Sequence, residues 1–212
     1  MVRGRPTARL RTQRTRRSLG SGPQIECLES RCVLDSTVVI NEIMYHPESD
    51  ESLLEWVELY NQQAVDMDLS GWTLQGATAF TFPEGTVIAG RGHLVVAASP
   101  ESLQSAAAIT GVLGPLEGRL DNGGEKLTLH DNNGRLLDEV EYEDDGAWPV
   151  AADGSGASLA KRDPATASGP ASNWTFSTQV GGTPGATNFP RPDAAPTRST
   201  LIDLSATGAY EQ

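Results

Sequence analysis

Short runs in which polar and apolar residues alternate, separated by Gly, Pro and Asn, extend from residue 38 to residue 177. The clearest run is LLEWVELYN at 53–61, where Val57 and Leu59 belong to one strand face and Trp56, Glu58 and Tyr60 to the other. Similar runs predict two short strands in 65–76 and further strands at 38–45, 79–82, 86–88, 93–97, 157–161 and 173–177. About eight short strands joined by such turns predict an all-β antiparallel sandwich, whose sheets have one face buried and one partly solvated.

Two other segments carry signatures of their own. Strict alternation over VVINEIMY at 38–45 places four residues on one strand face, namely Val39, Asn41, Ile43 and Tyr45. SPESLQSAAAITG at 99–111 is the one helical candidate, because Ser99 can cap a helix that begins at Pro100.

The segment DNGGEKLTLHDNNGRLLDEVEY, at 121–142, is rich in Asp, Asn and Gly, which suits either a calcium loop or a turn. An EF-hand loop needs Gly at position 6 and Glu at position 12, but with Gly134 at position 6, Val140 falls at position 12. A β-hairpin fits better, because apolar residues alternate on both sides of DNNG and Asn133-Gly134 suits the positive φ of a tight turn. The residues expected to face inward are Leu127, Leu129, Val140 and Tyr142.

Charge and composition divide the chain into three expected segments. Residues 1–36 contain eight Arg and three acidic residues, a net charge of +5, and are predicted to be a disordered leader or sorting segment. Residues 37–188 form the predicted sandwich, and the Pro-rich residues 189–212 a disordered tail or linker. Residues 37–212 hold eight basic and twenty-five acidic residues, a net charge of −17 that repels nucleic acid phosphates. No stretch reaches the ~18 apolar residues of a membrane helix.

The sequence contains no recognisable catalytic motif. Its three His residues lie on separate strands or strand ends without an HExxH pattern, and neither a P-loop nor a G-x-S-x-G turn occurs. Cys27 and Cys32 precede the predicted sandwich, and no second pair completes a zinc site. We therefore expect no catalytic residue, no cofactor and no enzymatic activity.

The acidic run DEVEYEDDG at 138–146 is the best remaining candidate for a metal site. Carboxylate oxygens of four residues could bind calcium, namely Asp138, Glu143, Asp144 and Asp145. The favoured interpretation is a solvated strand face followed by a turn, because apolar and acidic residues alternate in the first half of the run.

Trp56 and Tyr60 share one face of the 53–61 strand. They would form a small binding strip if that face were exposed, whereas packing against the rest of the sheet is the favoured alternative.

Seven motifs occur in the order and spacing of one family: INEIMYHP, EWVELYN, DLSGWTL, FPEGTVIAGRGHLVV, LDNGGEKLTLHDNNGRLLDEVEY, WP followed by GSGASLAKRD, and GGTPGATN. Over residues 37–188 the chain resembles the lamin tail domain family, in particular its bacterial extracellular branch. The resemblance implies an immunoglobulin-like β-sandwich, in agreement with the strand pattern.

The segment RRSLGSGPQIECLESRCVLDS resembles an N-terminal sorting motif of bacterial surface proteins, whose core reads LE-x-R-x-L-L. The matching residues are Leu28, Glu29, Arg31, Val33 and Leu34, with Val33 in place of the usual Leu. Both cysteines depart from that motif. The resemblance implies export, with removal of the leader as one outcome.

The expected function is that of a non-catalytic exported or cell-surface module that binds a protein or cell-envelope ligand or spaces other domains. The alternative is an intracellular protein, associated with nucleic acid or the envelope, that binds through its Arg-rich arm. A hydrolase with an unrecognised site has no positive support. Both a complete protein and one part of a longer multidomain chain fit the sequence.

Overall fold

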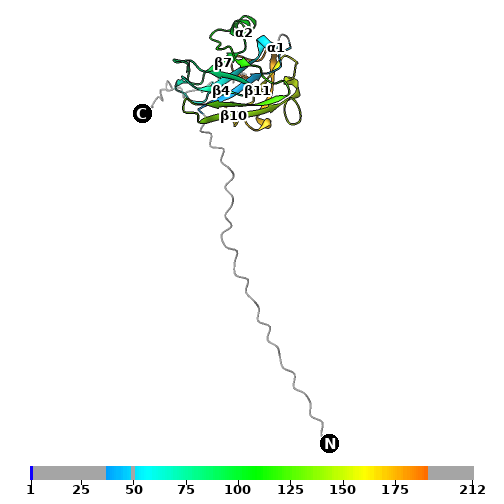
Figure 1. Cartoon of the computed structure of the whole chain (residues 1–212). Helices are drawn as coiled ribbons and strands as arrows, with labels where there is room; N and C mark the ends of the chain where they lie inside the picture. The colour runs from blue at the N-terminus through cyan, green and yellow to red at the C-terminus, as the bar shows by residue number, and fades with distance from the viewer. Residues whose placement is uncertain (2–36, 49–50, 191–212) are drawn as a thin grey trace, which may run out of the picture. The chain divides into compact units, whose positions relative to one another are not determined.

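Two five-stranded antiparallel sheets and a two-stranded ribbon contain the strands (Figure 1). This computed structural model describes Met1, residues 37–48 and residues 51–190. The first sheet has the order β12 (Trp174–Val180), β11 (Ala157–Lys161), β1 (Val38–Met44), β2 (Trp56–Asn61) and β7 (His93–Ala97). The second has the order β10 (Leu136–Glu143), β9 (Gly124–His130), β4 (Thr73–Gln75), β5 (Thr78–Thr81) and β8 (Glu117–Gly118). The ribbon pairs β3 (Met67–Asp68) with β6 (Val87–Ile88).

The remaining regular elements are short helices. They are α1 (Glu51–Leu54), α2 (Pro100–Ala107) and the 3-10 turns η1 (Val150–Ala152) and η2 (Ala171–Asn173). Ser99 caps α2 and Pro100 is its first residue, as predicted, but the helix ends earlier than residue 111 because Ala108 adopts a left-handed conformation. None of the described helices is long and apolar enough to cross a membrane.

The two sheets pack face to face around one hydrophobic core. Val57 and Leu59 of β2 meet Leu127 and Leu129 of β9 in this core, as the alternation predicted. Tyr142 of β10 joins them and stacks on Tyr45 with ring centroids 4.9 Å apart. This arrangement confirms the predicted immunoglobulin-like antiparallel β-sandwich.

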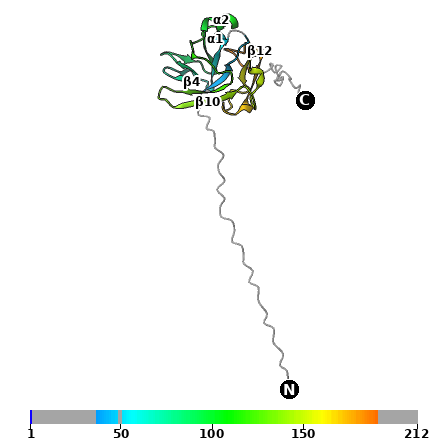
Figure 2. The same cartoon turned by 45° about the vertical axis from the view of Figure 1, so that its right-hand side comes forward.

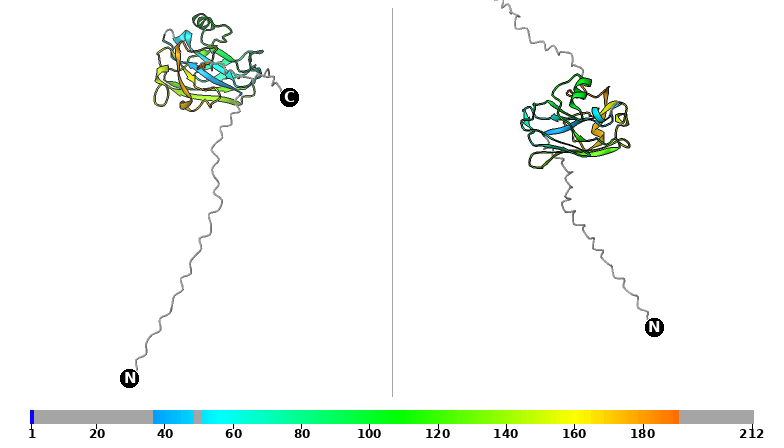
Figure 3. Two further views of the ribbon diagram at one scale, coloured as in Figure 1. Left: turned by 180° about the vertical axis from the view of Figure 1, so that it is seen from behind. Right: turned by 45° about the horizontal axis from the view of Figure 1, so that its top comes forward.

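A second hydrophobic cluster covers the outer face of the first sheet, which is the face directed away from the second sheet. Its members are Met44, Trp56, Val95, Ala97 and Leu103, which come from β1, β2, β7 and α2. The expectation of a partly solvated second face is therefore wrong for this part of β2, because α2 folds over it. Figure 2 shows α1 and α2 together on the side away from β10, and the view from behind in Figure 3 shows the same arrangement.

The alternation predicted for 38–45 is interrupted by a β-bulge. The pairing of β1 with β2 shifts register between Ile40 and Glu42. Ile40, Ile43 and Tyr45 therefore all reach the main core, whereas strict alternation would have placed Ile40 on the opposite face.

The predicted hairpin is confirmed, with a longer turn than expected. Leu136 of β10 pairs with His130 of β9, and the five residues between them form the connection. Gly134 has a φ of 77°, whereas Asn133 does not adopt a positive φ. The Asp131 carboxylate accepts hydrogen bonds from the amides of Asn133 and Arg135, so the side chain of Asp131 holds this turn closed.

Predictions about the two ends of the chain fall on residues that the structure does not describe. Residues 2–36 of the leader, with its sorting motif and both cysteines, lie outside the described residues, as does the tail beyond Pro190.

Candidate functional site

Buried polar residues lie on the outer face of the first sheet, beneath the segment Gly181–Asn188, which we call the strap. Glu42 of β1 is fully buried and accepts hydrogen bonds from the Thr183 amide at 2.9 Å and from its hydroxyl at 2.7 Å. The hydroxyl of Ser158 on β11 also donates to Glu42. The contacts of Thr183 tie the strap to β1, and Ser158 joins β11 to the same carboxyl group.

Glu58 of β2 holds the strap at a second position. Its Oε2 accepts a 2.6 Å hydrogen bond from the Gly185 amide, and its Oε1 accepts a 2.8 Å bond from the Asn41 side chain. Asn188, at the end of the strap, donates to the carbonyls of Asn41 and Lys161 at 3.1 and 3.0 Å. The strap is thus held to three adjacent strands of the sheet.

The two buried carboxyl groups favour their neutral forms. The pKa of Glu58 is raised to about 9, mainly by burial and also by the nearby Glu42, against the lowering effect of the hydrogen bonds from Asn41 and Gly185. Burial likewise raises the pKa of Glu42. Neither side chain is exposed to solvent, so neither can exchange a proton with a bound substrate without movement of the strap.

Gly182 of the strap lies too close to the sheet to carry a side chain. A Cβ there would stand 2.7 Å from Cζ2 of Trp56 and 2.8 Å from Oε1 of Glu42, and its φ is +76°. Glycine therefore permits the close approach of the strap to Trp56.

A cavity of ≈ 480 Å³ lies between the strap and α2 on the same outer face. We call it the outer groove, and it is lined by Met44 and Trp56 of the sheet, by Leu103, Ala106, Ala107 and Ile109 in and after α2, by Pro47, Glu48 and Leu54, and by Gly156, Gln179, Val180, Gly181, Gly182, Thr183, Pro184 and Ala186. Met44 and Trp56 are almost completely buried, whereas Val180 is 77 % exposed. Among the described residues that line it, Glu48 is the only ionisable one.

A smaller cavity of ≈ 330 Å³ near the end of the strap is more polar. Tyr60 and His93 contribute to it, with ring centroids 5.0 Å apart, together with Arg162, Asp163 and Phe189. Burial lowers the pKa of His93, whose Nε2 lies 4.0 Å from Oε1 of Glu58. A neutral imidazole beside a neutral carboxyl group is the expected state at neutral pH.

Trp56 and Tyr60 do not form the exposed strip that one interpretation of the sequence required. Trp56 is 1 % exposed and belongs to the second hydrophobic cluster, whereas Tyr60 stacks on His93 at the smaller cavity. Packing, the favoured alternative, holds for Trp56. The two residues contribute to different cavities on the sheet.

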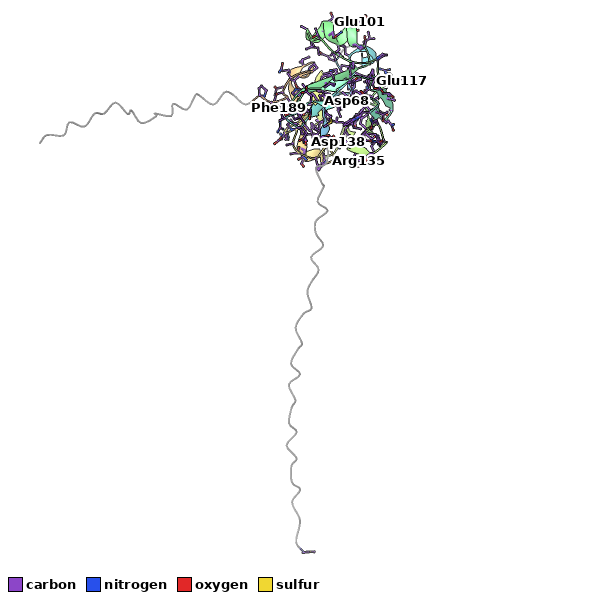
Figure 4. The ribbon with its side chains drawn as sticks, turned by 90° about the vertical axis from the view of Figure 1, so that its left-hand side faces the viewer. Asp68, Glu101, Glu117, Arg135, Asp138 and Phe189 are labelled. Carbon is purple, nitrogen blue, oxygen red and sulfur yellow. The ribbon has the colours of Figure 1, made fainter. Side chains whose placement is uncertain are left out.

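The four calcium candidates are not brought together. Asp138 accepts hydrogen bonds from the Ile40 amide at 2.8 Å and the Ser168 hydroxyl at 2.6 Å, and so joins β10 to β1. It lies at the Arg135 end of β10 (Figure 4), whereas Glu143 ends that strand and Asp144 and Asp145 follow it. Within residues 37–48 and 51–190, no three His, Cys, Asp or Glu side chains are arranged to hold a metal ion.

Lys161 is a buried charged residue that the sequence patterns did not single out. Its Nζ lies 6.0 Å from the centroid of the Trp174 ring and has no hydrogen-bond partner in the described part of the chain. Burial lowers the pKa of Lys161 to about 8, an effect that the nearby Asp138 partly opposes. Lys161 lies two residues after Leu159 in β11, so the two side chains share a strand face. This spacing was the only feature of the local sequence that indicated burial of the lysine.

Comparison with known proteins agrees with the motif order. No curated protein matches the chain. A family model for the lamin tail domain matches residues 35–144, which is just over half of the 212 residues. The matched region contains β1 to β10 and both α-helices, while β11, β12 and the strap follow it. The chain belongs to the lamin tail domain family, whose immunoglobulin-like domains are generally involved in protein interaction.

Proposed function

We propose that this protein is a non-catalytic binding module, exported to the cell surface or beyond, that recognises a protein or a component of the cell envelope. The observation that carries the proposal is the contrast between three of its carboxyl groups and the outer groove. Glu42, Glu58 and Asp138 are held within the fold by hydrogen bonds, whereas the outer groove is open and mostly apolar. A surface of this kind suits recognition of a partner through apolar contacts.

Export is supported by the charge distribution and by the leader. Residues 1–36 carry the Arg-rich LE-x-R-type segment, and residues 37–212 carry a net charge of −17. A strongly acidic surface keeps a domain soluble and separates it from nucleic acid. With this charge distribution, the Arg-rich arm is the part of the sequence that could bind the phosphates of a nucleic acid. Nucleic-acid binding by that arm is therefore the competing function.

Fractionation of the native cells, with mass spectrometry of the N-terminus of the protein, separates the two functions. A chain at the surface or in the medium that begins near Ser36 is the expected result. A cytoplasmic chain that retains Arg3 to Arg17 would contradict the proposal and favour nucleic-acid binding by the Arg-rich arm.

A further inference from the structure

The outer groove has the form of a preformed peptide site. Its floor is made by Met44 and Trp56, one wall by α2 and the other by the strap. Its volume of ≈ 480 Å³ falls within the range of about 300–1,000 Å³ that is usual for ligand sites.

Both walls are fixed in place, so a ligand would find the groove already formed. Leu103 of α2 packs into the cluster with Met44 and Trp56, which holds the helix against the sheet. The opposite wall is held by the hydrogen bonds of Thr183 and Gly185 to the buried carboxyl groups. Rigid walls lower the entropy lost on binding and therefore raise affinity.

The chemistry of the lining indicates what the groove accepts. Apolar side chains dominate it, and Val180 at its edge is 77 % exposed although it belongs to the strand β12. The described part of the lining contains one ionisable residue, the exposed and acidic Glu48. By sequence, residues 37–212 carry a net charge of −17, which favours cationic over anionic partners.

We propose that the outer groove binds a short peptide segment of another protein, which places apolar side chains against Trp56 and α2 and a Lys or Arg beside Glu48. This inference rests on the proposed binding function and specifies the partner. Two identical copies of this acidic domain would repel each other, which disfavours a second copy as the occupant. Apolar anchors with an adjacent Arg are a frequent composition at the centre of protein interfaces.

Selection from a displayed library of random short peptides on the full-length chain tests the inference. Peptides that combine apolar residues with Lys or Arg should be enriched. The affinity of one enriched peptide, measured by fluorescence anisotropy, should fall about tenfold or more in Ala106→Gln, which is equivalent to ~1.4 kcal/mol. Ala106 lies in the groove and is exposed, so the variant obstructs the site without entering the core.

Two further variants make the result specific. Ser105→Gln is the matched control, because Ser105 is also exposed on α2 but does not line the groove. The enriched peptide should bind this variant as tightly as it binds the unchanged chain. Glu48→Gln should weaken binding of the basic peptide and remove most of its salt dependence, because the screened charge pair is lost. Peptides that bind both helix variants equally would place the site elsewhere and overturn the inference.

Other occupants give distinct outcomes, and each of them contradicts the proposal. Enrichment of peptides that match residues 1–36 or 191–212 would assign the groove to a segment of this chain. A concentration-dependent dimer that Ala106→Gln abolishes would assign it to a second copy. Absence of enrichment would remove the peptide site, while a surface location found by fractionation would leave the proposed function standing.

Discussion

The amide of Gly185 donates a 2.6 Å hydrogen bond to Oε2 of Glu58, a residue 127 positions earlier in the chain. This bond joins the strap to the second strand of the protein, and the side chain of Glu58 that accepts it is fully buried. An unpaired carboxyl group at this depth would be strongly unfavourable. The strap therefore supplies the partners that allow Glu58 to be buried, and Glu58 in turn fixes one wall of the outer groove.

Stability should depend on pH because Glu58 holds a proton in the folded state. Burial raises its pKa from 4.5 to about 9, so the unfolded chain releases this proton at a lower pH than the folded chain does. The stabilising contribution is complete below pH 4.5 and is lost as the pH rises through about 9. We expect the free energy of unfolding in urea to fall between about pH 5 and about pH 8, at up to ~1.4 kcal/mol per pH unit for one proton.

Other groups modify this slope in known directions. The raised pKa of Glu42 adds to it, whereas the lowered pKa of His93 opposes it below the ordinary value of 6.5. Glu58→Gln should flatten the slope and lose about 1–3 kcal/mol at low pH, because an amide group then faces a hydrogen-bond donor. The exposed Glu117→Gln serves as the control. An unaltered slope in Glu58→Gln would show that Glu58 is not the source of the dependence.

Gly182→Ala should destabilise the protein by about 2 kcal/mol or more, because the new Cβ collides with Trp56 and Glu42 and takes a positive φ. Gly181→Ala is a matched control. Gly181 also has a positive φ, of +87°, but a Cβ there meets nothing within 4 Å, so only about 1 kcal/mol should be lost. Equal losses of unfolding free energy in urea would mean that crowding beneath the strap contributes nothing.

Gly134→Val should lower the free energy of unfolding by about 1–2 kcal/mol, because a β-branched residue resists the positive φ of this turn. The φ of Gly134 is +77° and no atom lies within 4 Å of the position of a Cβ, so backbone strain is the only penalty. Gly134→Asn should lose less, since Asn tolerates this conformation. Thermal unfolding measures both, and an unchanged melting temperature in the Val variant would contradict the turn assignment.

Asp138→Ala should destabilise the protein by about 2–4 kcal/mol, because two buried donors then lose their acceptor. These donors are the Ile40 amide and the Ser168 hydroxyl. Asp138→Asn retains one acceptor oxygen and should lose clearly less. Urea unfolding at neutral pH distinguishes the two, and equal effects would indicate that the charge of Asp138, through Lys161, matters more than its hydrogen bonds.

Removal of calcium should leave stability unchanged. Asp138 is engaged with Ile40 and Ser168, at the opposite end of β10 from Glu143. A ligand that binds only the folded state would raise the melting temperature, and the rise would grow with the ligand concentration relative to Kd. Melting curves with added calcium and with a chelator should therefore coincide, and a large drop with the chelator would restore the calcium site.

Local sequence patterns determined most of the secondary structure. Period-two alternation identified β2, β9 and β10, because a strand with one face in the core selects apolar residues at every second position. Ser99-Pro100 marked the start of α2, and Gly134 marked the hairpin turn, since both depend on local backbone geometry. The family, too, was recognisable from the order of its motifs.

Only the tertiary structure decided what happens on the outer face of the first sheet. Glu42 and Glu58 look in the sequence like solvated positions of alternating strands, yet they are buried because Thr183 and Gly185 approach them from more than 120 residues away. The bulge in β1 and the outer groove likewise follow from how distant segments pack. The alternation of polar and apolar residues predicts which positions share a strand face. Whether that face is buried depends on which distant segment of the chain covers it.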